Sequence, residues 1–219
     1  MPPKRPSWGL LLTAIVFAAY AMHPQAAAQQ MSELEDPVSD KRPTDESGAD
    51  EAAELRERLV FWLNGYHGAA SAEQLAALGE SATVAGALRE ICADARLRPS
   101  LRVRAIDGLG FFGEPSTVEF LKEIVDAPHQ ALESPRRSTA ERFQRHAMLS
   151  FARLEGPAAV ETLSRFLEAD DLQLRISAVE TIGRFGGQAG RLRLERLAAR
   201  VDDPVLEGKI EAFVGPGPP

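Results

Sequence analysis

Histidine, cysteine and serine are the residue types that acid–base or nucleophilic chemistry would require in this chain of 219 residues. The single cysteine, Cys92, has no second thiol with which to form an internal disulfide. The histidines are scattered and do not have the spacing of zinc ligands. They are His23, His67, His129 and His146. We therefore expect neither a structural metal nor a disulfide.

No catalytic motif accompanies these residues. The sequence lacks G-x-S-x-G, H-E-x-x-H and a phosphate-binding glycine loop. His146 lies inside an expected helix and His129 in a loop near Glu133, and neither has a nucleophile beside it. We therefore predict a protein that is not an enzyme and uses no cofactor.

Cys92 follows Leu88 and Ile91 on the apolar side of an expected helix. We interpret it as a buried, inert thiol. The alternative is an intermolecular disulfide in an oxidising compartment.

One basic stripe is the candidate binding site. It consists of Arg193, Arg196 and Arg200, with Arg191 beside them, on a helix whose leucines face inward. Guanidinium groups bind carboxylates well, so we predict that these arginines bind an acidic segment of a protein partner. The alternative is an ordinary solvated helix face.

The cluster Phe61, Trp62, Tyr66 and His67 has two interpretations. It packs in the core of a capping helix, which we favour, or it forms an interface hot spot.

The N-terminus has the pattern of a secretory signal peptide. Lys4 and Arg5 precede an apolar run from Trp8 to Met22, which ends in small residues. We predict a signal peptide over residues 1–28, cleaved after Ala28, and a periplasmic or secreted protein. The run is slightly short for a membrane span, and an uncleaved N-terminal membrane anchor is the alternative. After cleavage we expect no membrane-spanning segment.

Residues 29–53 are acidic, contain two prolines and lack aromatic residues, which predicts a disordered linker. Residues 29–54 carry nine acids against two bases, whereas residue 55 onward carries 23 acids against 21 bases. The nearly neutral remainder gives no electrostatic basis for binding nucleic acid, so we expect no nucleic-acid partner. Residues 216–219 are rich in proline and form a predicted disordered tail.

An internal repeat runs through residues 54–215. Three segments superpose when Ala105, Ala147 and Ala178 are placed in register. They are Leu101–Gly113, Phe143–Glu155 and Leu174–Gly186. Aliphatic or aromatic residues then coincide four and sixteen positions later, and a partial fourth copy places Ile210 at the alanine position. The helices upstream, over residues 54–66, 71–74 onward and 83–95, form a predicted cap and an atypical first repeat.

Each unit reads as a helix, a turn and a second helix. Apolar residues recur with helical period in both helices. Pro115 and Pro157 stand in the first turn of second helices, where the missing N–H costs nothing. The predicted capping signals are Ser71–Gln74, Ser138–Glu141 and Asp203–Pro204. Glycines at the turns are expected to adopt positive φ: Gly113, Gly156 and Gly186.

The repeated pattern of Leu, Arg, two variable residues, Ala, an aliphatic residue and Gly resembles HEAT-like repeats of the short bacterial type. Gln144 departs from it, because the other copies have arginine at that position. The resemblance implies an all-α protein, a short α-solenoid of about four HEAT-like hairpins. It also implies that second helices, among them the one bearing the arginine stripe, line a concave surface.

These features predict an exported scaffold that binds a protein partner on a curved helical surface. Similar repeats occur in chromophore lyases, so one alternative is an enzyme or lyase-like accessory acting on a protein substrate. Another is a structural subunit of an envelope complex, in which the last helix, over residues 205–214, docks onto a neighbour.

Overall fold

The described part of the chain is entirely helical. A computed structural model describes residues 46–65 and 71–215 and contains no strand among them, which confirms the predicted all-α class. The predicted signal peptide, the linker up to residue 45 and the tail lie outside the described residues. The α-helices are α1 Glu46–Asn64, α2 Ala72–Ala76, α3 Ser81–Ala93, α4 Pro99–Leu109, α5 Pro115–Asp126, α6 Pro128–Ala131, α7 Arg137–Glu155, α8 Ala159–Ser164, α9 Leu172–Phe185, α10 Gly187–Ala198 and α11 Pro204–Val214. Two 3₁₀ helices, η1 Gly156–Ala158 and η2 Arg165–Glu168, flank α8.

The first helix begins earlier than the sequence pattern indicates. Residues 46–53, which composition assigns to the linker, belong to α1. Glu51, Ala52 and Ala53 are residue types with high helix propensity, which net charge and proline content alone do not show. None of the described helices is both long and apolar enough to cross a membrane.

Two of the three predicted capping signals are confirmed. Ser71 and Gln74 form a reciprocal capping box at α2, and the Asp203 side chain accepts hydrogen bonds from the first turn of α11. The prediction at Ser138 is wrong, because α7 begins at Arg137 and has no side-chain cap. Glu141 instead accepts a hydrogen bond from Arg137 Nε at 2.7 Å, one helical turn away, and this pair competes with the capping arrangement.

The turns between paired helices differ in detail. Pro115 begins α5 as predicted, whereas Pro157 lies in η1, so the second helix of that unit is a chain of short 3₁₀ and α segments. Gly156 has the predicted positive φ of 56°. Gly186 does not, since its φ is −74°, and neither does Gly113. In the turn between α9 and α10, the residue with a left-handed backbone is Gly187.

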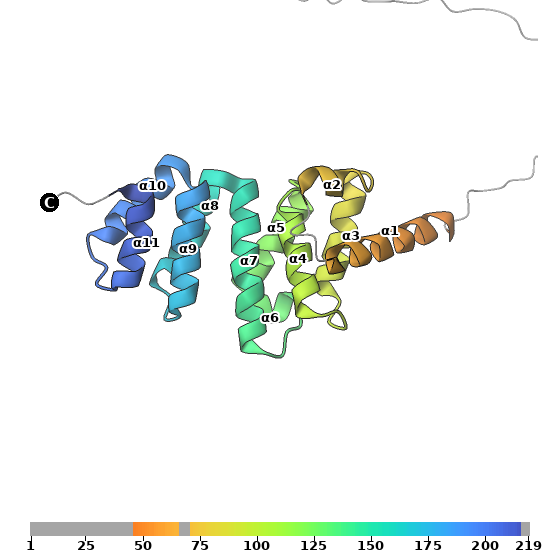
Figure 1. The fold of residues 1–219 in the computed structure, drawn as a ribbon, viewed down its shortest axis with the longest axis horizontal. Coiled ribbons are helices and arrows are strands. Elements are labelled where there is room, and N and C mark those ends of the chain that lie inside the picture. The colour runs from red at the N-terminus through yellow and green to blue at the C-terminus, as the bar shows by residue number, and fades with distance from the viewer. Residues whose placement is uncertain (1–45, 66–70, 216–219) are drawn as a thin grey trace, which may run out of the picture. The chain divides into compact units, whose positions relative to one another are not determined.

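The repeat positions form the core. The residues at the small position, Ala105, Ala147 and Ala178, are fully buried, and so is Ile210 in the partial copy. The equivalent hydrophobic residues are also buried: Leu109, Phe151 and Ile182 after four positions, and Leu121, Leu163 and Leu194 after sixteen. Figure 1 shows the first helices of the units side by side, and α7 contacts α4 and α9 while α9 contacts α11. Small residues allow these helices to approach closely.

A second repeat position supplies side chains that contact the ends of neighbouring helices. It lies three residues before each buried alanine and is occupied by Arg102, Gln144 and Arg175. Arg102 reaches a carbonyl in the last turn of α3, that of Cys92, at 2.6 Å. Gln144 reaches one in the last turn of α5 at 2.8 Å. Arg175 instead approaches the carboxylate of Asp203 at 3.7 Å. Carbonyls in the last turn of a helix have no partner within the helix, so this position stabilises the junctions in the first two units.

Candidate functional site

A groove lies between α5 and α8 and is closed at its base by the last turns of α7. It has a volume of about 740 Å³ and is open to solvent along one side. Buried Phe151 and half-buried Val118 supply apolar surface, and Thr162 belongs to the α8 side. An open hollow of this size suits a peptide segment better than a small enclosed ligand.

Carboxylates dominate the charge of this groove. Glu119 and Glu123 come from successive turns of α5, and Glu155 comes from the last turn of α7. None of these three has an ion-pair partner within the described residues. Asp126 is paired with Arg165, and Lys122 is the one basic residue in the lining of the groove. The groove therefore favours a ligand with positive charge.

Sequence reasoning missed this groove. Glu119 and Glu123 are four residues apart on an exposed helix face, a pattern that most often marks a solvated surface. One feature of the sequence could have indicated the acidic groove. Helix α5 contains three acidic residues and one basic residue, whereas the helix with the arginine stripe contains one acidic residue and three basic residues.

The four predicted binding arginines lie on or just after α10, and none lines the groove. Arg191 pairs with Glu195 at 3.1 Å, and Arg200, beyond the end of the helix, pairs with Glu168 at 2.5 Å. Arg193 is half-buried, and only Arg196 is both exposed and outside the ion pairs of the described region. The structure thus brings the four together but compensates half of their charge. Their role in partner binding stays a prediction.

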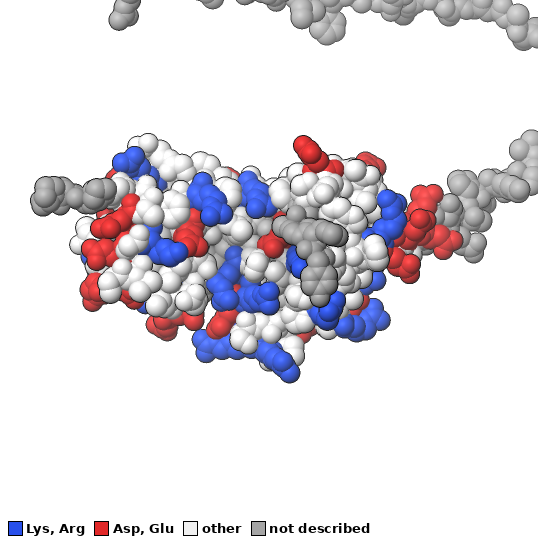
Figure 2. Space-filling model, viewed as in Figure 1, with Lys and Arg blue, Asp and Glu red and all other residues white. Residues whose placement is uncertain are grey.

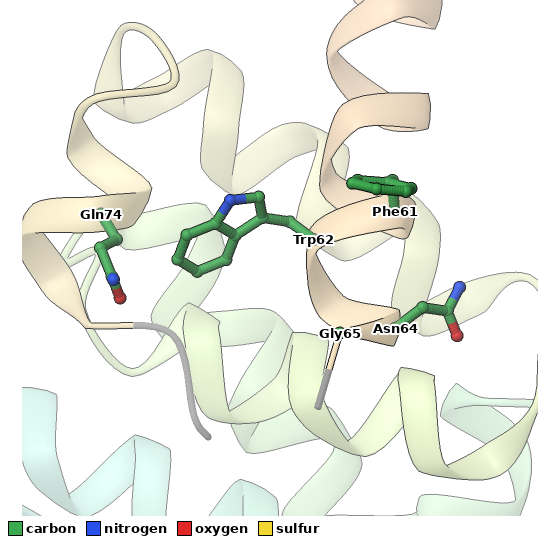
Figure 3. A pocket seen from close by; sticks show the side chains of 5 residues that line it. All are labelled: Phe61, Trp62, Asn64, Gly65 and Gln74. Atoms are coloured by element: carbon green, nitrogen blue, oxygen red, sulfur yellow. The ribbon is translucent and has the colours of Figure 1, made fainter. Parts of the chain in front are cut away.

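The aromatic residues of α1 are more exposed than we expected. The core-packing interpretation is wrong for Phe61, which is 81% exposed, while Trp62 is 37% exposed. Figure 3 shows Trp62 pointing across a hollow toward Gln74 of α2, and Phe61 lines the same hollow. The leucines of α1 take the inward positions instead. Tyr66 and His67 lie outside the described residues.

The residues that could take part in acid–base or nucleophilic chemistry are engaged in structural contacts. Cys92 is fully buried, which confirms the predicted burial, and burial raises the pKa of its thiol well above the ordinary value. His129 Nδ1 lies 2.9 Å from the carbonyl oxygen of Ser134, and His146 Nδ1 lies 2.7 Å from Asp107 Oδ1. Within residues 46–65 and 71–215, no group of acidic, histidine or cysteine side chains has the geometry of a metal site.

The comparisons with known proteins give no further identification. No model of a known protein family matches the chain, and no curated protein matches it.

Proposed function

We propose that this protein is an exported scaffold that binds another protein along the groove between α5 and α8. In this proposal the helices form a short α-solenoid of about four HEAT-like hairpins. The burial of equivalent repeat positions, with Ala105, Ala147 and Ala178 all at 0% exposure, supports it. The signal-like pattern of residues 1–28 supports export.

One groove combines apolar surface with carboxylates that have no ion-pair partner among the described residues, and this combination carries the proposal. Glu119, Glu123 and Glu155 surround a hollow whose apolar surface comes from Phe151 and Val118. A protein segment with lysine or arginine residues around an aliphatic side chain complements both features. The partner class is therefore a basic, partly apolar polypeptide segment.

The first experiment removes charge from the groove. We expect the variant Glu119→Gln/Glu123→Gln to bind a fluorescent peptide of alternating lysine and leucine about tenfold more weakly than the unaltered mature chain. Each exposed carboxylate contributes modestly, so two are changed together. Fluorescence anisotropy at low salt measures the dissociation constants. The matched control, Glu207→Gln/Glu211→Gln, removes two exposed acids from α11 and should change binding by less than about twofold.

A second readout tests the role itself. A photoactivatable residue at position 162 in the groove should cross-link the mature chain to a protein of the envelope fraction, and Glu119→Gln/Glu123→Gln should remove that cross-link. Equal peptide binding by the groove and control variants would contradict the site. Conversion of a small molecule by the purified chain alone would contradict the scaffold role and favour the enzyme alternative.

A further inference from the structure

Acid–base pairs connect successive first helices at equivalent repeat positions. Asp107 stands two residues after the buried alanine of α4 and meets His146, one residue before the buried alanine of α7, at 2.7 Å. Glu180 stands at the same position of α9 and meets Lys209, one residue before Ile210 of α11, at 2.5 Å. The same two positions thus form the contact at both junctions.

The junction between α7 and α9 lacks this pair. There the equivalent positions hold Leu149 and Ser177, and these two residues line a cleft of about 240 Å³. Neither side chain is charged, and serine is short. The hollow therefore lies at the one junction of the three that has no acid–base pair.

Two arginines stand at this cleft. Arg145 of α7 and Arg184 of α9 both line it, and neither forms an ion pair within the described residues. The acidic residue of the lining, Glu180, is already neutralised by Lys209. Figure 2 shows Lys and Arg side chains gathered over the middle of the molecule, where Figure 1 places α7. The cleft therefore carries uncompensated positive charge.

The polar atoms around the cleft fit an anionic oxygen ligand. Guanidinium groups donate paired hydrogen bonds to carboxylates, and the hydroxyls of Ser177 and Thr181 add two further donors to the lining. Leu149 supplies apolar surface suited to the methylene groups of a glutamate side chain. His146 also lines the cleft, and its Nδ1 is engaged by Asp107.

We propose that the cleft between α7 and α9 binds a carboxylate side chain from an acidic segment of a protein partner. This site is separate from the acidic groove and has the opposite charge preference. The protein would thus hold basic and acidic segments on two different surfaces.

The test fills the cleft without changing the net charge. The variant Leu149→Glu/Ser177→Lys places at this junction the pair that joins α9 to α11. We expect it to bind a fluorescent peptide of alternating glutamate and glycine at least about tenfold more weakly than the unaltered mature chain. Its thermal midpoint should be unchanged or higher, since the new residues repeat a pair that the fold already accommodates.

A second variant separates this cleft from general electrostatic attraction. Arg145→Gln/Arg184→Gln should weaken binding of the acidic peptide about tenfold, whereas Arg58→Gln/Arg136→Gln, with the same loss of charge at two exposed positions outside the lining of the cleft, should change it less than about twofold. Equal weakening by both variants, or undiminished binding by the filled variant, would overturn the proposal. The basic peptide should bind the filled variant normally, so this test and that of the groove fail independently.

Discussion

Replacing Arg102 by methionine is expected to lower the free energy of unfolding by about 3 kcal/mol. Arg102 is only 4% exposed and has no carboxylate partner within residues 46–65 and 71–215. Its Nε donates to the carbonyl of Cys92 and its Nη2 to that of Leu132, each at 2.6 Å, and its guanidinium lies 4.8 Å from the ring centroid of Phe143.

The loss of stability arises from the two carbonyl groups that stay buried after the substitution. Methionine has a similar length but donates no hydrogen bond, so two buried carbonyls lose their partner, at about 1–3 kcal/mol each. Removal of a buried charge offsets part of this loss, because burial disfavours the charged guanidinium and lowers the pKa of Arg102. Such a change is a large fraction of the stability of an ordinary domain, which is about 5–15 kcal/mol.

Urea denaturation followed by circular dichroism measures this effect. Arg102→Gln should lie between the unaltered protein and Arg102→Met, because Gln144 shows that glutamine reaches one such carbonyl. The control Arg142→Met alters an exposed arginine of α7 and should change stability by less than about 0.5 kcal/mol. Equal stability of Arg102→Met and the control would show that the carbonyl contacts contribute nothing.

Replacing Gly183 by alanine is expected to lower the stability of the α9–α11 junction by about 2 kcal/mol. A Cβ atom at this position would lie 2.3 Å from Cγ of Phe213, so the Phe213 ring or α11 has to move. We take a steric cost of about 3 kcal/mol against a gain in helix propensity of about 1 kcal/mol. Amide hydrogen exchange should become faster in α11 and remain unchanged in α3.

Two further variants test the cause. Adding Phe213→Ala to Gly183→Ala should remove the clash, so the double variant should be more stable than the sum of the single changes predicts. Gly208→Ala on α11 meets nothing within 4 Å and should be neutral or stabilising by up to about 1 kcal/mol. Additive losses in the double variant would be inconsistent with a direct contact between residues 183 and 213.

Hydrophobic periodicity was enough to predict the helical class and the core. The register of Ala105, Ala147 and Ala178 identifies positions that are all fully buried, because burial depends on local period. The residues that form the carbonyl contacts and the acid–base pairs also stand at equivalent positions in this register. It does not show which side chains reach across a junction, since the Asp107–His146 contact spans 39 residues of sequence.

The charged surfaces were not predictable in this way. Glu195 stands beside Arg191 in the sequence, but Glu168, 32 residues before Arg200, pairs with the arginine stripe only through the fold. The groove depends on how α5, the last turns of α7 and α8 come together, and Pro157 does not begin a regular helix there. Long-range pairing of side chains, rather than local propensity, decides which charges remain available to a partner.

The central claim is that the first helices stand in a row, in the order α4, α7, α9 and α11, rather than around one centre. The most direct test is a pulsed electron paramagnetic resonance distance between nitroxides at Ser100→Cys and Glu207→Cys, two exposed sites in the first turns of α4 and α11. Cys92 is buried and its raised pKa keeps it as the unreactive thiol, so it should not take the label. Neighbouring helices pack about 8–10 Å apart, so a row of four predicts a distance of about 25–35 Å, whereas a distance of about 10–15 Å would contradict it.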